Sequence, residues 1–476
     1  MKRSLTNAAA VVAAVAVAFS AWAVLGLFFV QSPAGPSRLP PPSPALTPTV
    51  KVHEPSPIVD KNLPDLVMNV PFDITVGEDV SLAGLQEDFD VLSWDTFVAL
   101  NWPPAGPGLP DGSKTIGENG DNPTVWETYK PSQEIFLKDG EPPAPWGATG
   151  AGVIPQAGLV CYRPGMRVLS QVGKTPGLLT ESVQPFKTGP LIDQHGRYAR
   201  FEILVNQSMF QSIVDNKLYS KTAQKGVKSV VFRCSSGADN EQGAIMVKAA
   251  WKLLTDEEKA SARFHTAQAL IYSPPSDIPR VAEKCETATV GLVGLHLVHK
   301  TKGAPQWVWS TFEQVDNCPT DGDGAPLPRY SFYNKNTPAA PKNDPPPRPW
   351  DPDRTEPPER RTQAVRMIPV TDAAEKLNAR FQAALRAVNK GSVWQHYRLI
   401  STQWPTNPAK GCDVKATAPV DRIGTPAPQF LGNSTLETYI PRTVPGVSSS
   451  CMECHNNATT TAGVFSDFTF LLERAQ

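Results

Sequence analysis

The alternation of apolar and polar residues predicts strands over much of the chain. Three segments have the alternating period of a half-buried strand: 197–206, 244–254 and 394–402. Two apolar runs, 290–300 and 306–315, are joined by a short turn that contains glycine and proline, which predicts a β-hairpin. These segments predict a β-rich body.

Helical periodicity is confined to short segments. Three segments have helical spacing of apolar residues: 93–102, 208–218 and 373–389. Ser93 is the expected N-cap of the first, and Thr255 followed by three acidic residues predicts the start of another short helix. A last apolar run, 465–472, predicts a helix near the C-terminus. We therefore expect an α+β fold with short helices and long loops rich in proline and glycine.

Two proline-rich segments, 31–58 and 338–358, divide the chain, and each holds nine prolines. Such a composition cannot bury a core and favours extended backbone. The expected organisation is a β-rich body over 59–337 and a C-terminal region over 359–476, with these two segments as linkers.

The N-terminus has the features of an export signal. Lys2 and Arg3 precede an uncharged apolar run, residues 8–30, which is long enough to span a bilayer. The basic residues keep the N-terminus in the cytoplasm, so the rest of the chain is expected in the periplasm or an equivalent space. We favour an uncleaved anchor in the inner membrane; secretion after cleavage at residues 21–23, Ala-Trp-Ala, is the alternative.

Near the C-terminus, residues 451–455 read Cys-Met-Glu-Cys-His, the CxxCH pattern for covalent attachment of a c-type haem. Cys451 and Cys454 can form thioethers to one haem, and His455 then lies beneath it as the proximal iron ligand. A zinc site would need a second ligand pair at suitable spacing, and a thioredoxin-like pair would need a preceding strand. The sequence therefore predicts one covalent haem c.

A sixth iron ligand must come from upstream or be absent, because residues 456–476 contain neither Met nor His. His296 and His299 rank first among the candidates, and on a strand they point to opposite faces because their separation is odd. His396 and Met367 follow them. Each of these side chains is more often a packed or hydrogen-bonded residue than a ligand.

Five further cysteines are expected in a compartment where disulfides persist: Cys161, Cys234, Cys285, Cys318 and Cys412. Two bridges and one free thiol is the simplest count, and Cys285 with Cys318 is the closest pair flanking the predicted hairpin. Five buried thiols are the alternative.

The net charge of −1, without a basic cluster, argues against nucleic acid as a partner. We expect instead a redox partner protein or a small-molecule substrate, and contact with the membrane through the N-terminal segment.

Four further blocks carry a resemblance that covers roughly residues 75–476: 93–103 (SWDTFVALNWP), 294–301 (GLHLVHKT), 305–317 (PQWVWSTFEQVDN) and 433–441 (NSTLETYIP). With the CxxCH motif, the chain resembles large exported single-haem proteins of the cytochrome c family in proteobacteria. The resemblance implies haem binding and carries over only Cys451, Cys454 and His455.

The sequence favours a membrane-tethered monohaem cytochrome that transfers electrons in the periplasm. The body is larger than a simple carrier needs, so we also consider a haem-dependent oxidoreductase of peroxidase or oxygenase type with an open sixth position, and a haem-based sensor.

Overall fold

The computed structural model describes the chain from residue 63 onward, with gaps. The described residues are 63–120, 122–148, 166–170, 184–185, 188–237, 241–273, 276–277, 280–281, 284–322, 324, 326–327, 330–337, 341–346, 361–408, 412, 424–440 and 449–476. The apolar run 8–30, the linker 31–58 and Cys161 lie outside them. Residues Val50–Gln476 form one compact unit.

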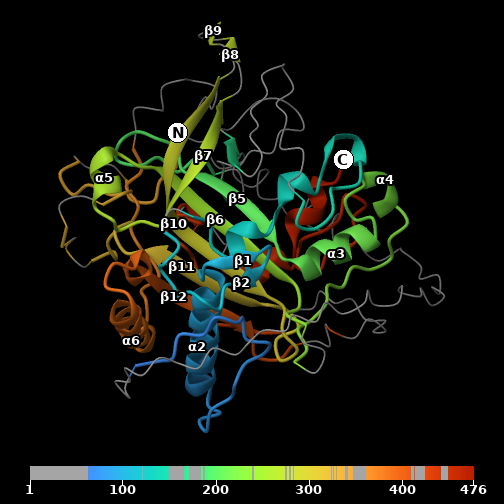
Figure 1. Ribbon diagram of the computed structural model, residues 1–476, viewed down its shortest axis with the longest axis horizontal. Coiled ribbons are helices and arrows are strands. Elements are labelled where there is room, and N and C mark those ends of the chain that lie inside the picture. The colour runs from blue at the N-terminus through green and yellow to red at the C-terminus, as the bar shows by residue number, and fades with distance from the viewer. Residues whose placement is uncertain are drawn as a thin grey trace, which may run out of the picture. The chain divides into compact units, whose positions relative to one another are not determined.

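A nine-stranded sheet, almost entirely antiparallel, forms the framework of this unit (Figure 1). Its strands are β3 (Lys130–Pro131), β4 (Arg167–Ser170), β5 (Arg200–Val205), β6 (Ile245–Leu253), β7 (Thr266–Ser273), β10 (Lys284–His299), β11 (Val308–Gln314), β12 (Tyr397–Pro405) and β13 (Pro426–Ala427). The order is β13-β12-β11-β10-β6-β5-β3, and β7 pairs with both β10 and β4. Two small hairpins are separate from this sheet: β1 (Pro104–Gly106) with β2 (Leu109–Pro110), and β8 (Ser276–Asp277) with β9 (Arg280–Val281).

The predicted hairpin is confirmed as β10 and β11, which pair antiparallel from Gly294↔Glu313 to His299↔Val308. The half of β10 that pairs with β11 also pairs with β6, while its N-terminal half pairs with β7. The predicted α+β class is confirmed, with 24% helix and 24% strand around a large antiparallel sheet. Strand β12, from the C-terminal region, pairs with β11 and so extends the sheet of the body.

Two helices, α2 (Leu82–Leu100) and α6 (Asp372–Val388), contribute to the core on one face of the sheet, called here the helical face. Their aromatic rings form its centre, where Trp94 stacks on Phe381 with ring centroids 4.9 Å apart and Phe97 stacks on Phe312 at 4.3 Å. Helix-on-sheet packing of this kind buries one apolar face of each element.

The predicted start of α2 at Ser93 is wrong. The helix begins eleven residues earlier at Leu82, where the side chain of Ser81 accepts a hydrogen bond from the Gly84 amide. Ser93 instead lies within the helix, fully buried, and its hydroxyl is 2.6 Å from those of Ser310 and Thr402 on the sheet. Ser93 therefore makes polar contacts across the helix–sheet interface and does not cap the helix.

The other helices in the described residues are short: α3 (Gln207–Asp215), α4 (Lys221–Gln224), α5 (Asp256–Ala260) and α8 (Cys451–His455). Thr255 caps α5 in a capping box with Glu258, as its sequence predicts. Single 3-10 turns are η1 (Trp126–Thr128), η2 (Ser132–Glu134), η3 (Lys138–Gly140), η5 (Val393–His396) and η6 (Phe470–Arg474). The short helix predicted for the apolar run 465–472 is present only in its last three residues, which begin η6.

The other face of the sheet, called here the C-terminal face, is covered by the end of the chain and by α3. Met246, Val298 and Trp309 form one core cluster there with Met452 of α8 and Leu472 of η6. In Figure 1 the red C-terminal segment lies beside α3 and α4, where the Lys221 amide donates to the Gln476 carbonyl oxygen at 3.0 Å.

Cys234 and Cys412 form a disulfide across 178 residues of sequence, which is consistent with an extracytoplasmic protein. Cys285 is also disulfide-bonded. The suggested pair of Cys285 with Cys318 is wrong, because Cys318 is a free, buried thiol. No helix among the described residues has the length and apolar character needed to cross a membrane.

Candidate functional site

The CxxCH motif forms α8, a single helical turn docked on the C-terminal face. The Ser450 side chain caps it by accepting from the Glu453 amide at 3.4 Å. Gln403 of β12 accepts from the Met452 amide at 2.8 Å, which ties the helix to the sheet. Cys451 and Cys454 lie one turn apart and are therefore on the same side of the helix, and both are free thiols.

The His455 imidazole is held by one hydrogen bond and two aromatic rings. Its Nδ1 donates to the Phe468 carbonyl oxygen at 2.7 Å. The rings of Trp309 and Phe470 lie against it, with centroids 4.5 Å and 5.1 Å from that of the imidazole. Within the described part of the chain Nε2 makes no hydrogen bond, so this nitrogen is left for another partner.

Burial lowers the pKa of His455 to about 4, against which the Phe468 carbonyl acts in the opposite direction. The imidazole is therefore neutral at neutral pH, as a metal ligand must be. Burial also raises the pKa of the Cys451 and Cys454 thiols, so neither is held as a reactive thiolate.

A row of polar residues crosses the C-terminal face beside α8. Lys248 on β6, His296 on β10 and Thr311 on β11 are register partners and so share this face. His296 Nε2 lies 3.0 Å and 3.1 Å from the two carboxylate oxygens of Glu437, and its Nδ1 hydrogen-bonds with the Thr311 hydroxyl. Lys248, His296 and Glu437 all influence the pKa of His455, which places them in its surroundings.

Glu437 is ionised although it is half-buried. Burial opposes ionisation of its carboxyl group, but contact with His296 and a hydrogen bond from the Asn433 amide outweigh it and lower the pKa below its ordinary value. The carboxylate and the imidazole therefore form a polar pair on the face of the sheet that carries the CxxCH helix.

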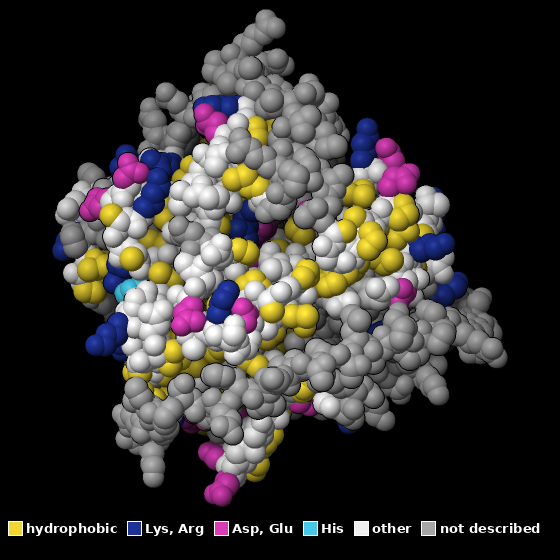
Figure 2. All heavy atoms as spheres, viewed as in Figure 1, with side chains coloured by type: hydrophobic (Ala, Val, Ile, Leu, Met, Phe, Trp, Pro, Cys, Tyr) yellow, Lys and Arg dark blue, Asp and Glu magenta, His cyan; other side chains and the backbone are white. Residues whose placement is uncertain are grey.

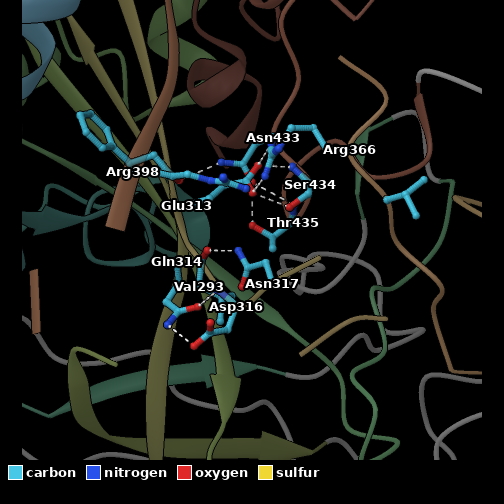
Figure 3. A network of polar contacts seen from close by, with 12 residues as sticks. Val293, Glu313, Gln314, Asp316, Asn317, Arg366, Arg398, Asn433, Ser434 and Thr435 are labelled. Atoms are coloured by element: carbon cyan, nitrogen blue, oxygen red, sulfur yellow. Dashed lines mark hydrogen bonds and ion pairs between the residues drawn. The ribbon is translucent and has the colours of Figure 1, made fainter. Parts of the chain in front are cut away.

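A buried network positions the turn that carries Glu437 (Figure 3). Glu313 of β11 accepts from the Ser434 amide and hydroxyl, both at 2.6 Å, and from both terminal nitrogens of Arg366. Asn433 donates to the Phe312 carbonyl oxygen at 3.0 Å. In Figure 3 Arg366 and Ser434, from two different segments of the chain, both point toward Glu313. The turn 433–437 is thereby fixed to the sheet.

Gly294 allows this turn to approach β10. A Cβ at that position would lie 2.0 Å from the Thr435 hydroxyl oxygen, so any side chain would push the turn away. The glycine in the middle of a buried strand is thus explained by a close approach.

The four distal candidates are distributed over different parts of the fold. His296 faces the same side as α8. His299 lies on the helical face, where its Nε2 is 2.5 Å from the Gln242 carbonyl oxygen and burial lowers its pKa to about 4. His396 precedes β12, seven residues before Gln403, which at ~3.3 Å per residue puts it roughly 20 Å from the contact with α8. Met367 lines a small pocket with Asn433 and Glu437.

The residues present fit a covalently bound haem. Metal-ligating histidines commonly donate their second ring nitrogen to a backbone carbonyl, as His455 does to Phe468. In the ranges that the structure describes, no group of three or more His, Cys, Asp or Glu is arranged around a single ion. The two thiols and the imidazole are thus not gathered as they would be in a zinc site.

Sequence reasoning missed Glu437, Thr311 and Phe468. None of them belongs to a local motif, and each reaches the site only through pairing with segments distant in sequence. The available signals were the block 305–317, which contains Thr311, and the block 433–441, which contains Glu437, and the sequence attached no mechanism to either.

Comparison with protein-family models, with curated proteins and with solved structures finds no match to this chain.

Proposed function

We propose that this chain is an exported monohaem c-type cytochrome that transfers electrons outside the cytoplasm, with haem c attached to Cys451 and Cys454 and ligated by His455. The observation that carries the proposal is the hydrogen bond from His455 Nδ1 to the Phe468 carbonyl oxygen, because it leaves Nε2 available for iron. The haem supplies a one-electron iron couple.

The chain's own residues orient and protect the ligand. The rings of Trp309 and Phe470 pack against the imidazole and limit its rotation. Gln403 and Ser450 hold the start of α8, which carries both thiols, on the sheet. A preorganised ligand loses little energy to rearrangement when the oxidation state changes.

The compartment is part of the proposal. The Cys234–Cys412 disulfide supports an oxidising environment, and the apolar run 8–30 supplies either a membrane anchor or a cleaved signal. The proline-rich segment 31–58 then links the anchor to the body. The partner of the proposed cytochrome would be a redox protein. On the face shown in Figure 2, the described basic and acidic side chains are interspersed, with no patch of a single charge.

The pair of His296 and Glu437 favours a second candidate, a haem-dependent oxidoreductase. Both ring nitrogens of His296 have partners, Glu437 at Nε2 and Thr311 at Nδ1. Polar, hydrogen-bonding side chains beside a haem favour the binding and activation of a substrate at an open iron position.

The visible spectrum of the full-length chain, produced by cells that export it and attach haem, tests the proposal. Intact mass should show one added haem. A low-spin spectrum that is unchanged by CO in the ferrous state supports electron transfer; a high-spin, CO-binding spectrum supports the oxidoreductase, and peroxide and O₂ turnover are then measured. A chain without haem, under conditions that load a known c-type cytochrome, contradicts both candidates.

A further inference from the structure

Lys300 and Asp467 form an ion pair in the interior, next to the proximal histidine. Lys300 Nζ lies 2.5 Å from Asp467 Oδ2, and both side chains are 0% exposed. The same oxygen accepts from the Phe232 amide at 2.7 Å, and the Asp467 carbonyl oxygen accepts from Trp307 Nε1 at 3.1 Å. Phe232 and two residues of the connection between β10 and β11 thus converge on one residue of the C-terminal chain.

The backbone at this point has an unusual conformation. Asp467 has φ 53° and Phe468 has φ 65°, so two successive residues other than glycine lie in the left-handed region. Trp307, which donates to this segment, has φ 71°. Such conformations are unfavourable for residues with a Cβ and persist where surrounding contacts enforce them, often at functional sites.

This backbone conformation determines a hydrogen bond of His455 in the CxxCH motif. Phe468 supplies the carbonyl oxygen that accepts from His455 Nδ1 at 2.7 Å. The backbone angles at 467 and 468 decide where that carbonyl points, so the contacts of Asp467 control the acceptor of the ligand's hydrogen bond.

We propose that the buried Lys300–Asp467 pair is a positioning device that holds the Phe468 carbonyl oxygen on His455 Nδ1 and so sets how strongly His455 donates electrons to the haem iron. The inference rests on the proposed haem ligation by His455. Lys300 and Asp467 are positioning residues and touch no reacting atom.

The expected effect has a definite sign. A hydrogen bond from Nδ1 to a carbonyl raises the basicity of the imidazole, and a more basic ligand stabilises ferric over ferrous iron. Loss of the pair should weaken that bond and raise the reduction potential. Because single-charge changes shift the potential on their own, the pair must be removed without changing the net charge.

The test uses the full-length holoprotein with both Lys300→Met and Asp467→Asn, which leaves the net charge unaltered. We expect the ratio of ferrous to ferric haem at a fixed potential to rise on the order of tenfold, about 59 mV for one electron. We also expect the His455 Nδ1 proton, followed by NMR, to exchange with deuterium about tenfold faster or more. The single variant Lys300→Arg, which keeps a charged hydrogen-bond donor, should retain most of the wild-type reduction potential and proton-exchange rate.

The matched control is Lys252→Met with Glu258→Gln. Lys252 is also a buried lysine, 1% exposed, whose Nζ lies 2.5 Å from Glu258 Oε1 and 3.7 Å from Asp193 Oδ2. Its described ion pairs and hydrogen bonds involve none of the residues 466–470. This variant should lose stability and keep the wild-type potential and proton exchange. The comparison separates a general loss of stability from an effect on the ligand.

An unchanged potential and unchanged Nδ1 exchange in the haem-loaded double variant would overturn the inference while leaving the proposed function intact. Absence of haem from the wild type would instead overturn the proposed function, and with it this role. If the double variant does not fold, Trp307→Phe removes the hydrogen bond to the Asp467 carbonyl oxygen while it keeps an aromatic ring beside Phe232 and Lys300. It should shift both quantities in the same direction, and no shift would contradict the proposal.

Discussion

Glu437 and His296 are separated by 141 residues in sequence, yet both carboxylate oxygens of Glu437 lie within 3.1 Å of His296 Nε2. This contact is made on the C-terminal face of the sheet, beside the CxxCH helix. It makes His296 the histidine of β10 that can act at the proposed haem, whereas His299 is turned to the helical face.

Replacing His296 should therefore change the haem environment, and replacing His299 should not. We expect His296→Ala to alter the ferric spectrum or the affinity of the ferrous form for CO, because it removes the imidazole nearest the motif on this face. His299→Ala is the matched control on the same strand. Equal spectra for wild type and His296→Ala would show that His296 does not affect the proposed haem.

The attachment chemistry can be tested at the thiols. Cys451→Ala with Cys454→Ala should abolish covalent haem, seen as loss of haem staining on a denaturing gel and loss of the haem from the intact mass. Cys318→Ala, which removes the free and buried thiol outside the motif, should retain it. Covalent haem in the double variant would place attachment elsewhere in the chain.

Gly294→Ala should destabilise the protein by about 1–3 kcal/mol, because the new Cβ would overlap the Thr435 hydroxyl and displace the turn that bears Glu437. Urea unfolding measures the loss. The loss should shrink when Thr435→Ala is already present, since the clashing oxygen is then gone. Gly106→Ala, where a Cβ would meet nothing within 4 Å, is the control. Equal costs at the two glycines would contradict the close approach.

Asp90 predicts a pH dependence of stability. Burial raises the pKa of this carboxyl group to about 7, against hydrogen bonds from Thr402 and Gln86 that lower it. Because the folded pKa lies above the unfolded value, the contribution of Asp90 to stability is fully present below about pH 4 and is lost as pH rises through 7. Asp90→Asn should thus be more stable than wild type at pH 8, by roughly 2 to 4 kcal/mol, with the difference vanishing near pH 4.

Urea unfolding of both forms from pH 4 to pH 8 measures this difference. Asp215→Asn, which changes an exposed carboxylate at the end of α3, is the control and should follow the wild-type curve. A difference between Asp90→Asn and wild type that is constant with pH would mean that Asp90 has an ordinary pKa.

Elements with strong local signals were predictable from sequence. The β10–β11 hairpin has long apolar runs and a turn between them, and the start of α5 has a complete capping box at Thr255. The start of α2 was not predictable, because Asp90 and Ser93 lie on its buried side and interrupt the apolar period. Their burial is compensated by polar groups of β11 and β12, which local spacing does not reveal.

The site divides in the same way. CxxCH is a local pattern, so the thiols and His455 could be named in advance. Phe468 acts through its backbone carbonyl and Glu437 through a turn fixed by Glu313. The direction of a backbone carbonyl and a contact between distant segments both depend on the fold. Neither can be predicted from the sequence around the residue.

Every strand of the nine-stranded sheet ends at or before Ala427, so backbone pairing does not require the last 49 residues of the chain. Those residues instead cover Met246, Val298 and Trp309. A chain whose end has not yet docked would present this apolar surface to its neighbours, and such surfaces promote aggregation. Docking of the C-terminal residues and the solubility of the whole body are therefore coupled.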